Sequence, residues 1–182
     1  MSGWTYDVVT ISGMPGSGTT TAARLVVSAT GFRYVNTGAI FREMAQERGV
    51  TLNEFGKLAN ENPEVDRELD DRQIALARAG KVLLEGRLAG YMVDGAGVRA
   101  LKVWLAAPLD VRLTRVSGRD GQDLEVARKL SQEREEDERK RFIEFYGFDL
   151  GRTEVYDLVI DSSCHRPAEI SRMIFRAVSA GR

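Results

Sequence analysis

Short apolar runs alternate along the chain with longer stretches in which apolar residues recur at the spacing of a helix. The apolar runs predict five strands, at residues 6–11, 32–35, 82–84, 101–105 and 157–161. The helical spacing predicts helices over residues 18–30, 37–79, 108–146 and 167–180. The second stretch is interrupted at Gly49, Thr51 and Pro63, and the third between Gly118 and Gly121. Strands that alternate with helices indicate an α/β fold, in which helices cover both faces of a parallel sheet.

The segment between the second and third predicted strands is too long for a single crossover helix, because more than forty residues there follow helical spacing. We expect these residues to form a small helical subdomain over the carboxyl edge of the sheet, where folds of this type bind their ligands. The 182 residues then form a single domain. Its core takes residues 1–36, 81–111 and 148–182, the helical insert takes residues 37–80, and a lid with a charged helix takes residues 112–147.

Composition and charge exclude several classes of protein. The chain has 26 basic and 27 acidic residues and a net charge of −1, so no basic field favours nucleic acid or an anionic membrane. Its single cysteine, Cys164, excludes an intrachain disulfide and a cysteine-rich zinc site, and its single histidine, His165, would have to serve any catalytic triad. No apolar run reaches the roughly 20 residues of a membrane span, and the N-terminus lacks a secretory signal. We therefore expect a cytoplasmic protein that binds small molecules and neither nucleic acid nor membrane.

A glycine-rich segment follows the first predicted strand directly and precedes a helix. Residues 13–20 read Gly-Met-Pro-Gly-Ser-Gly-Thr-Thr, which matches the phosphate loop G-x-x-x-x-G-K-[ST] except at Thr19, where the motif has lysine. Glycines let backbone N–H groups surround a phosphate, and the N-terminus of the following helix attracts its charge. Thr20 occupies the position whose hydroxyl ligates Mg²⁺. An ordinary glycine-rich turn is the alternative, but the position between strand and helix favours a nucleoside triphosphate site.

The missing lysine calls for another cation at the phosphates, and arginine is the natural substitute because its guanidinium binds phosphate oxygens in pairs. Arg42 lies about one helical turn after the second predicted strand, and Arg87 follows the third strand directly after Gly86. Neighbouring parallel strands end at one edge of the sheet, so both arginines are expected beside the phosphate loop. Glu85, at the tip of the third strand, is placed to hold Mg²⁺ through water.

The predicted charged helix has one informative stripe. Residues 131–141 carry nine charges in eleven positions, which alone would indicate a solvated face. One stripe of this helix, however, is apolar at both ends and charged in the middle: Ala127, Leu130, Arg134, Glu138, Arg141 and Phe145. If the helix packs by both ends, Arg134, Glu138 and Arg141 point inward. Buried charges need a partner there, such as a phosphate or sugar hydroxyls.

Two further arginine patterns are consistent with the same site. Arg72 lies within an apolar stripe of the helical insert, so we expect it to point inward as well. Arg112, Arg115 and Arg119 recur at helical spacing before a glycine-flanked break, which is typical of a lid that closes over phosphates. A plain surface helix would show the same spacing.

These segments together resemble nucleoside monophosphate kinases, most closely the archaeal cytidylate kinases, over essentially the whole chain. The resemblance rests on the loop at 13–21, T-G-x-x-x-R at 37–42, the segment 67–73, E-G-R-L-A-G at 85–90 and the charged helix at 134–141. It implies a P-loop NTPase-like three-layer sandwich with a five-stranded parallel sheet, a helical monophosphate-binding subdomain and a short lid. It also implies transfer of a phosphoryl group from ATP, with Mg²⁺, to CMP or dCMP in pyrimidine nucleotide metabolism.

The residue patterns and the resemblance together assign roles to particular residues. For catalysis they indicate Arg115, Arg119, Arg134 and Arg141. For ATP they indicate Gly13, Met14, Pro15, Gly16, Ser17, Gly18, Thr19, Thr20 and Thr21. Mg²⁺ is expected at Thr20 and, through water, at Glu85. For the acceptor they indicate Thr37, Gly38, Arg42, Asp70, Arg72, Arg87 and Glu138.

One position departs from the family. Bacterial cytidylate kinases have an aspartate after the arginine of G-R-D that helps to read cytosine, and here that position is Leu88. Base selectivity must therefore come from elsewhere, and Asp66, Asp70 and Arg72 are the candidates.

Two other functions stay open from the sequence. The missing lysine permits an ATP-binding regulatory module without turnover, and the fold also permits a kinase for AMP or for a small metabolite such as shikimate. We expect a monomer. Cys164 and His165 follow the fifth predicted strand, where this fold usually places the ATP base, and we expect both to be surface residues.

Overall fold

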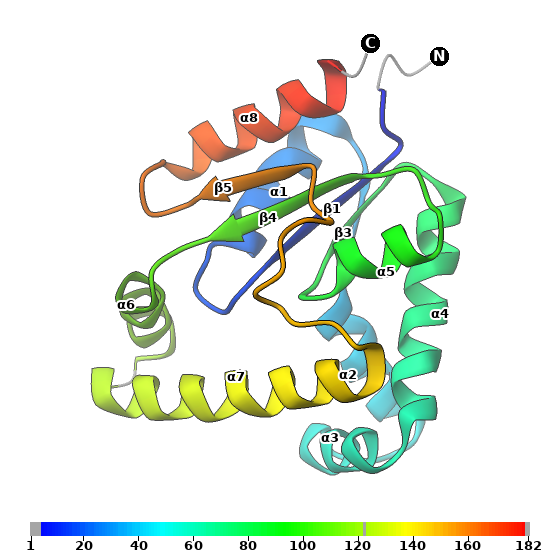
Figure 1. Ribbon diagram of the computed structural model, residues 1–182, viewed down its shortest axis with the longest axis vertical. Helices are drawn as coiled ribbons and strands as arrows, with labels where there is room; N and C mark the ends of the chain where they lie inside the picture. Colours follow the sequence, from blue (N-terminus) through cyan, green and yellow to red (C-terminus); the bar gives the residue numbers. More distant parts are fainter. Residues whose placement is uncertain (1–4, 122, 181–182) are drawn as a thin grey trace.

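The computed structural model describes residues 5–121 and 123–180, without the side chains of residues 52, 53, 134 and 180 (Figure 1). In chain order the elements are β1 (Val8–Gly13), α1 (Thr19–Thr30), β2 (Arg33–Asn36), α2 (Thr37–Glu47), α3 (Leu52–Glu61), α4 (Pro63–Ala79), β3 (Val82–Glu85), α5 (Ala89–Gly95), β4 (Leu101–Ala106), α6 (Leu109–Asp120), α7 (Leu124–Tyr146), β5 (Leu158–Asp161) and α8 (Pro167–Ala180). All five predicted strands are present, and so are the predicted helical stretches. The sequence pattern does not predict α5, whose seven residues include two glycines.

The strands form one sheet in the order β2-β3-β1-β4-β5, and every neighbouring pair is parallel. The predicted α/β fold with a five-stranded parallel sheet is thus confirmed. Because the strands are parallel, all of them end at the same edge. The central strand β1 pairs with β3, and Ile11 lies opposite Glu85. This pairing brings the end of β3 next to the loop that follows β1.

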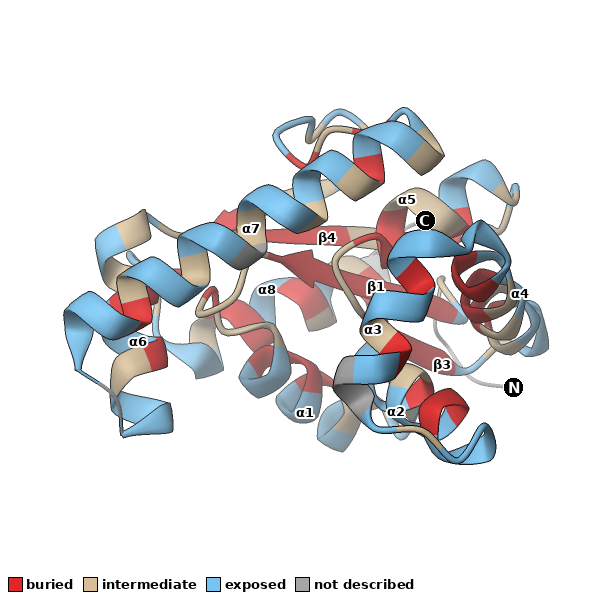
Figure 2. Cartoon of the chain, turned by 90° about the horizontal axis from the view of Figure 1, so that it is seen from below, coloured by how far each residue is buried: buried red, intermediate tan, exposed pale blue. Residues whose placement is uncertain are grey.

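Two apolar layers hold the helices on the sheet. On one face Val9 and Ile11 pack with Val26 of α1 and Ile174 of α8, all of them fully buried. The other face, which includes Val8, carries α2, α4 and α5. Figure 2 shows the buried strands between helices whose outer surfaces are exposed. This is the three-layer arrangement that the sequence predicts.

Helices α2, α3 and α4 occupy the long segment between β2 and β3. Thr51 begins α3 with a capping box, in which its hydroxyl accepts from the Glu54 N–H and the Glu54 carboxylate accepts from the Thr51 N–H. Phe55 of α3 is fully buried, and it belongs to the same apolar cluster as Val8 of the central strand. The three helices therefore share a core with one face of the sheet.

Helices α6 and α7 lie beside the carboxyl edge of the sheet (Figure 1). The break predicted between Gly118 and Gly121 lies at the end of that range, because α6 continues to Asp120 and is capped by Gly121 with φ of 64°. The end of α7 packs into a third apolar cluster together with residues 147–157. The buried members of this cluster are Leu88, Trp104, Phe142, Phe148, Leu150 and Tyr156. Among the described residues, no helix is both long enough and apolar enough to cross a membrane.

Candidate active site

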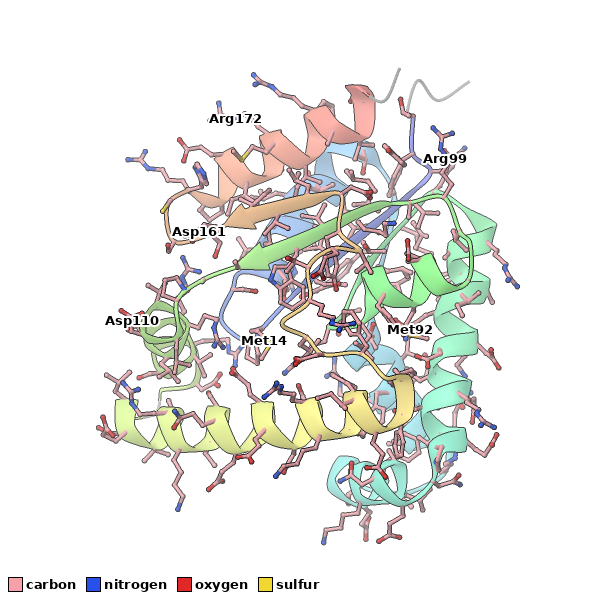
Figure 3. The ribbon with its side chains drawn as sticks, in the orientation of Figure 1. Met14, Met92, Arg99, Asp110, Asp161 and Arg172 are labelled. Carbon is pink, nitrogen blue, oxygen red and sulfur yellow. The ribbon has the colours of Figure 1, made fainter. Side chains whose placement is uncertain are left out.

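A cleft of about 770 Å³ opens at the carboxyl edge of the sheet. Its walls come from the end of β1, the start of α1, the ends of β2 and β3, and helices α2, α3, α4 and α7. The volume lies within the range of pockets that bind small molecules. Figure 3 shows side chains of α7 and of the strand ends extending into the space between them, with Met14 labelled at the loop after β1.

The loop between β1 and α1 has the conformation of a phosphate-binding loop. Gly16 and Gly18 adopt left-handed φ values of 82° and 90°, which side chains rarely allow. A Cβ atom at Gly16 would also lie 2.4 Å from the carbonyl oxygen of Arg112. Helix α1 begins at Thr19, so its N-terminal N–H groups face the loop. The strand–loop–helix context predicted for residues 13–21 is therefore present.

Glu85, at the end of β3, is the centre of a hydrogen-bond network beneath this loop. Its carboxylate accepts from the hydroxyls of Thr19 and Thr20, each at 2.7 Å, and from the Asn36 amide at 2.9 Å. The Tyr34 hydroxyl donates to the same carboxylate. Burial and the bond to Glu85 raise the pKa of Tyr34 to about 12, so the phenol stays a donor at neutral pH. Glu85 is only 5% exposed, and the network fixes both of its oxygens.

The oxygens of this network fit Mg²⁺ bound with a nucleotide. Mg²⁺ prefers hard oxygen ligands and usually keeps several waters and substrate phosphates in its shell. The Thr20 hydroxyl lies beside the Glu85 carboxylate at the mouth of the phosphate loop. Among the described residues, no group of three or more His, Cys, Asp or Glu side chains could hold a metal ion without help. Thr20 and Glu85 would therefore hold the ion together with the nucleotide phosphates and water.

Charged residues of α7 line the cleft, as the helical stripe predicts. Glu138 forms an ion pair with Arg87 at the end of β3. The Arg141 guanidinium lies with Nε 3.7 Å from Asp66 Oδ2, and it donates to Asn60 Oδ1 at 3.3 Å. Helix α7 is thus connected to the sheet and to the helical insert through charged groups.

The prediction that both apolar ends of the stripe are buried is partly wrong. Ala127 is buried, but Leu130 is 50% exposed. At the other end Phe142, and not Phe145, is buried in the third apolar cluster. The side chain of Arg134 lies outside the described residues, so its predicted inward direction stays a prediction.

The segments after β2 and β3 touch where the acceptor site is expected. A Cβ atom at Gly86 would lie 2.2 Å from Thr37 Oγ1, so glycine is required for this close approach. The Thr37 hydroxyl donates to the buried Gln73 at 2.7 Å. Gly38 and Arg42 line the cleft on the same side. Together with Arg87 and Arg141, Arg42 gives the cleft a group of cations apart from the phosphate loop.

Two aspartates of α4 are buried in the wall of the cleft. Asp66 is 4% exposed and Asp70 is 7% exposed, and the Tyr146 hydroxyl donates to Asp70 Oδ2 at 2.7 Å. Burial raises the pKa of Asp70 to about 7, and the charges of Asp66 and Asp71 add to the shift while the Tyr146 bond opposes it. Burial also raises the pKa of Asp66, against the attraction of the Arg141 guanidinium.

Comparison with known proteins shows which family the chain belongs to. The model of the cytidylate kinase-like family matches residues 8–164. The cytidylate kinase of Methanopyrus kandleri is 50% identical over 163 residues, which cover 86% of this chain and 84% of the relative. The cytidylate kinase of Pyrococcus furiosus is 47% identical over 171 residues, which cover 94% and 88%. The chain belongs to the cytidylate kinase-like family.

This member of the cytidylate kinase-like family shares its fold with solved structures of other kinases. Shikimate kinase from Bacteroides thetaiotaomicron matches with a TM-score of 0.66 at 12% identity, over 93% of this chain and 97% of that one. An identity this low shows a shared fold and nothing about the acceptor. The predicted resemblance to the archaeal cytidylate kinases is confirmed by the sequence relatives.

The arginines of α6 contact the phosphate loop of this cytidylate kinase-like chain in two places. Arg112 donates to the Pro15 carbonyl at 3.3 Å and forms an ion pair with Glu135 of α7. Arg115 donates to the Gly16 carbonyl at 3.1 Å and to groups of the loop after β5. Both guanidinium groups therefore hold the backbone of the loop.

Arg119 does not share this environment. Its guanidinium is exposed and binds the carboxylate of the neighbouring Asp120 at 2.6 Å. Helical spacing puts Arg119 on the same stripe as Arg115, but it lies in the last turn of α6, where the chain leaves the helix. Its predicted action on the transferring phosphate finds no support in this arrangement.

Arg72 also differs from its prediction. It binds Glu47 of α2 at 2.6 Å and Glu68 of α4 at 2.8 Å, and it is not among the residues that line the cleft. Its neighbour Gln73 is buried and lines the cleft instead. Arg72 lies at the boundary of the apolar stripe, where nearby carboxylates at the surface satisfy its charge. The structure therefore gives no support to Arg72 as an acceptor-binding or base-reading residue.

We expect Arg72→Ala to leave catalysis nearly unchanged. The kcat/KM for the acceptor should stay within about twofold and the melting temperature should fall by no more than about 2 °C, because partly exposed ion pairs contribute little. Steady-state kinetics and a thermal melt measure both. A large rise in the acceptor KM would show that Arg72 enters the cleft when the acceptor binds.

We expect Asp70→Asn to stabilise the protein more at pH 8 than at pH 5. The folded-state pKa of Asp70 is raised, so the native state binds this proton more tightly than the unfolded chain, and wild-type stability is lost as the pH rises from about 4 to about 7. Asparagine carries no charge, so the gain at pH 8 should be on the order of 2 kcal/mol. Urea unfolding at the two pH values measures it. An equal effect at both would contradict the raised pKa.

Two residues after β5 lie where the ATP base was expected. Cys164 is exposed, as predicted, and its Sγ lies 3.7 Å from Asp161 Oδ2. His165 is partly exposed. Sequence reasoning did not find the bonds of Tyr34 and Asn36 to Glu85, although the pairing of β2 with β3 places Asn36 directly opposite Glu85.

Proposed function

We propose that the protein transfers the γ-phosphoryl group of Mg-ATP to CMP or dCMP and releases ADP with CDP or dCDP. The observation that carries this proposal is one continuous cleft that joins a phosphate loop to a group of arginines. A protein that only binds ATP has no use for this group. Relatives named cytidylate kinase, at 42–50% identity, support the choice of a cytidine nucleotide as acceptor.

In this proposal the two nucleotides enter from opposite ends of the cleft. The phosphates of ATP lie in the loop of residues 13–21, and Mg²⁺ is held by Thr20 and, through water, by Glu85. The phosphate of the acceptor lies against Arg42, Arg87 and Arg141. We propose that a monomer carries out this reaction, because this chain itself supplies both the phosphate loop and the arginines of the cleft.

The proposed chemistry needs charge and position and no general base. An oxygen of the acceptor phosphate forms a bond to the γ-phosphorus while the bond to the bridging oxygen breaks, and ADP keeps the bonding electrons. Mg²⁺ supplies screening of the phosphate charge when the nucleotide is bound. Thr19 supplies no charge and its hydroxyl is bound to Glu85. The arginines must therefore take over the screening that the lysine of the motif provides.

Two of the four arginines proposed for catalysis have supporting contacts. Arg141 lines the cleft, and Arg115 binds the carbonyl group of Gly16 in the phosphate loop. Roles for Arg134 and Arg119 rest on the sequence alone. We include Arg115 and Arg141 in the proposal for this reason.

An acceptor scan tests the proposal. Purified protein with Mg-ATP should phosphorylate CMP and dCMP best and UMP less well, and it should act poorly on AMP and not on shikimate. A coupled assay for ADP formation gives kcat/KM for each. A higher kcat/KM for AMP or shikimate would overturn the choice of acceptor. ATP binding in a calorimeter without any diphosphate product would favour a regulatory module instead.

A further inference from the structure

Four acidic residues line the cleft among the residues that the structure describes: Asp66, Asp70, Glu85 and Glu138. Two of them already have partners, because Glu85 accepts from four donors at the phosphate loop and Glu138 is paired with Arg87. The other two are the aspartates of α4. Spaced four residues apart, they lie on one face of the helix.

Asp66 has an oxygen that no described group satisfies. Its Oδ2 is buried and has no hydrogen-bond donor among the described residues, and the nearest cation, Arg141 Nε, is 3.7 Å away. Buried polar oxygens are normally hydrogen-bonded, and a buried carboxylate without a donor is costly. An oxygen of this kind in the wall of a cleft points to a ligand that brings a donor.

Asp70 differs from Asp66 in its neighbours. Its Oδ2 accepts from the Tyr146 hydroxyl, and no arginine is paired with it among the described residues. When two carboxyl groups are neighbours, the negative charge of the first to ionise makes the second keep its proton to a higher pH. Burial raises the pKa of Asp70 to about 7 and also raises the pKa of Asp66; the Arg141 guanidinium opposes both shifts, and its Nε lies 3.7 Å from Asp66 Oδ2. Near neutral pH the pair therefore offers one acceptor, Asp66, and one donor, Asp70.

We propose that Asp66 and Asp70 read the base of the acceptor nucleotide: Asp66 accepts a hydrogen bond from an exocyclic amino group, and protonated Asp70 donates one to the adjacent ring nitrogen. Cytosine presents this amino group beside an unprotonated nitrogen, whereas uracil presents a carbonyl oxygen beside an N–H. Uracil would face Asp66 with an acceptor and Asp70 with a donor, so both bonds would be lost. This inference rests on the proposed function and deepens it.

The inference also explains how a base can be read without the aspartate of G-R-D. Leu88 stands at that position, lines the cleft and packs into the third apolar cluster. The carboxylates of α4 provide polar groups at another wall of the same cleft. Adenine shares the amino-and-nitrogen pattern with cytosine, so the rejection of AMP has to come from the shape of the cleft.

The first test compares CMP with UMP in two variants and a control. In Asp66→Asn the amide can turn either its oxygen or its nitrogen to the base, so the ratio of kcat/KM for CMP over UMP should fall about 100-fold. In Asp70→Asn the amide replaces the carboxyl donor, so activity with CMP should stay within about tenfold of wild type. Glu64→Gln, at an exposed residue of the same helix, should leave the ratio unchanged. An unchanged ratio in Asp66→Asn would overturn the inference.

A second test uses the wild-type protein and stays valid if a variant fails to fold. The ratio of kcat/KM for CMP over UMP should fall by at least about fivefold between about pH 6 and about pH 8, as Asp70 loses its proton. The acceptor phosphate titrates alike in both nucleotides, so its effect cancels in the ratio. Other charged groups that line the cleft are Arg42, Lys57, Glu85, Arg87, Glu138 and Arg141. In Asp70→Asn the ratio should not change with pH, and if it still does, another of these groups carries the dependence and the inference is overturned.

These outcomes are distinct from a failure of the proposed function. Wild-type protein that phosphorylates no nucleotide would remove the proposed function and the base assignment together. Wild-type protein that phosphorylates CMP, with a ratio that neither pH nor Asp66→Asn changes, would leave the kinase standing and remove only the role of the α4 aspartates.

Discussion

Glu85→Gln should lower kcat about 100- to 1000-fold and raise the Mg²⁺ concentration needed for half-maximal activity. The carboxylate accepts from Thr19, Thr20, Tyr34 and Asn36. In glutamine an NH₂ group replaces one of the two accepting oxygens. Two of the four donors would then face another donor and lose their hydrogen bonds, and buried donors without an acceptor are costly. The Thr20 hydroxyl would lose the partner that orients it toward the metal.

Kinetics at a series of Mg²⁺ concentrations measure this effect. The exposed Glu61→Gln on α3 is the matched control and should behave as wild type. Tyr34→Phe removes one of the four donors and should give a smaller shift in the same direction. If Glu85→Gln lost activity with an unchanged Mg²⁺ requirement, the carboxylate would act on folding and not on the metal.

Arg87→Met should lower kcat/KM for the acceptor about 1000-fold and destabilise the protein by about 2 kcal/mol. The guanidinium is a proposed ligand of the acceptor phosphate and is paired with Glu138 in the cleft. Methionine keeps much of the volume but leaves the largely buried Glu138 without this cation, which is costly. ATP binding alone should change little, because the phosphate loop is formed by other residues.

The double variant Arg87→Met with Glu138→Gln separates the two effects. Removing the second charge should restore most of the stability, while the activity should stay low. Arg139→Met is the control, since its ion pair with Asp149 lies at the surface. Acceptor kinetics and urea unfolding measure both quantities. Recovery of activity in the double variant would show that Arg87 only balances Glu138 and does not hold the acceptor.

The sheet and the phosphate loop could be predicted from the sequence because their signals are local. A buried parallel strand is a continuous apolar run, and the loop at residues 13–21 needs glycines at fixed positions. Helix α5 lacks such a signal, because its seven residues include Gly90 and Gly95 and span only two turns. Strand order also escapes local reasoning, since it depends on where each crossover returns to the sheet.

The candidate site was predictable only in part, because spacing fixes a stripe and not its boundaries. Glu138 and Arg141 point into the cleft as predicted, but Arg72 on the same kind of stripe pairs with Glu47 and Glu68. Arg72 differs from Glu138 and Arg141 because residues distant in the sequence decide which side chains surround each of them. Leu130 was expected to pack and is exposed, because the start of α7 lies beside α6 and away from the sheet (Figure 1).

The C-terminal end of α7 is packed more firmly than its N-terminal end, so a tilt of the helix would move the N-terminal end most. Its C-terminal end is fixed at Phe142 by the third apolar cluster, while Leu124, some 18 residues away, lies about 27 Å along the axis. A tilt of 10° about Phe142 would move that far end by about 5 Å, and would move Glu135, about 10 Å from the pivot, by about 2 Å. A shift of that size would break the ion pair of Glu135 with Arg112, whose guanidinium also donates to the carbonyl group of Pro15. The position of α7 is thereby coupled, through the single guanidinium group of Arg112, to the backbone of the phosphate loop.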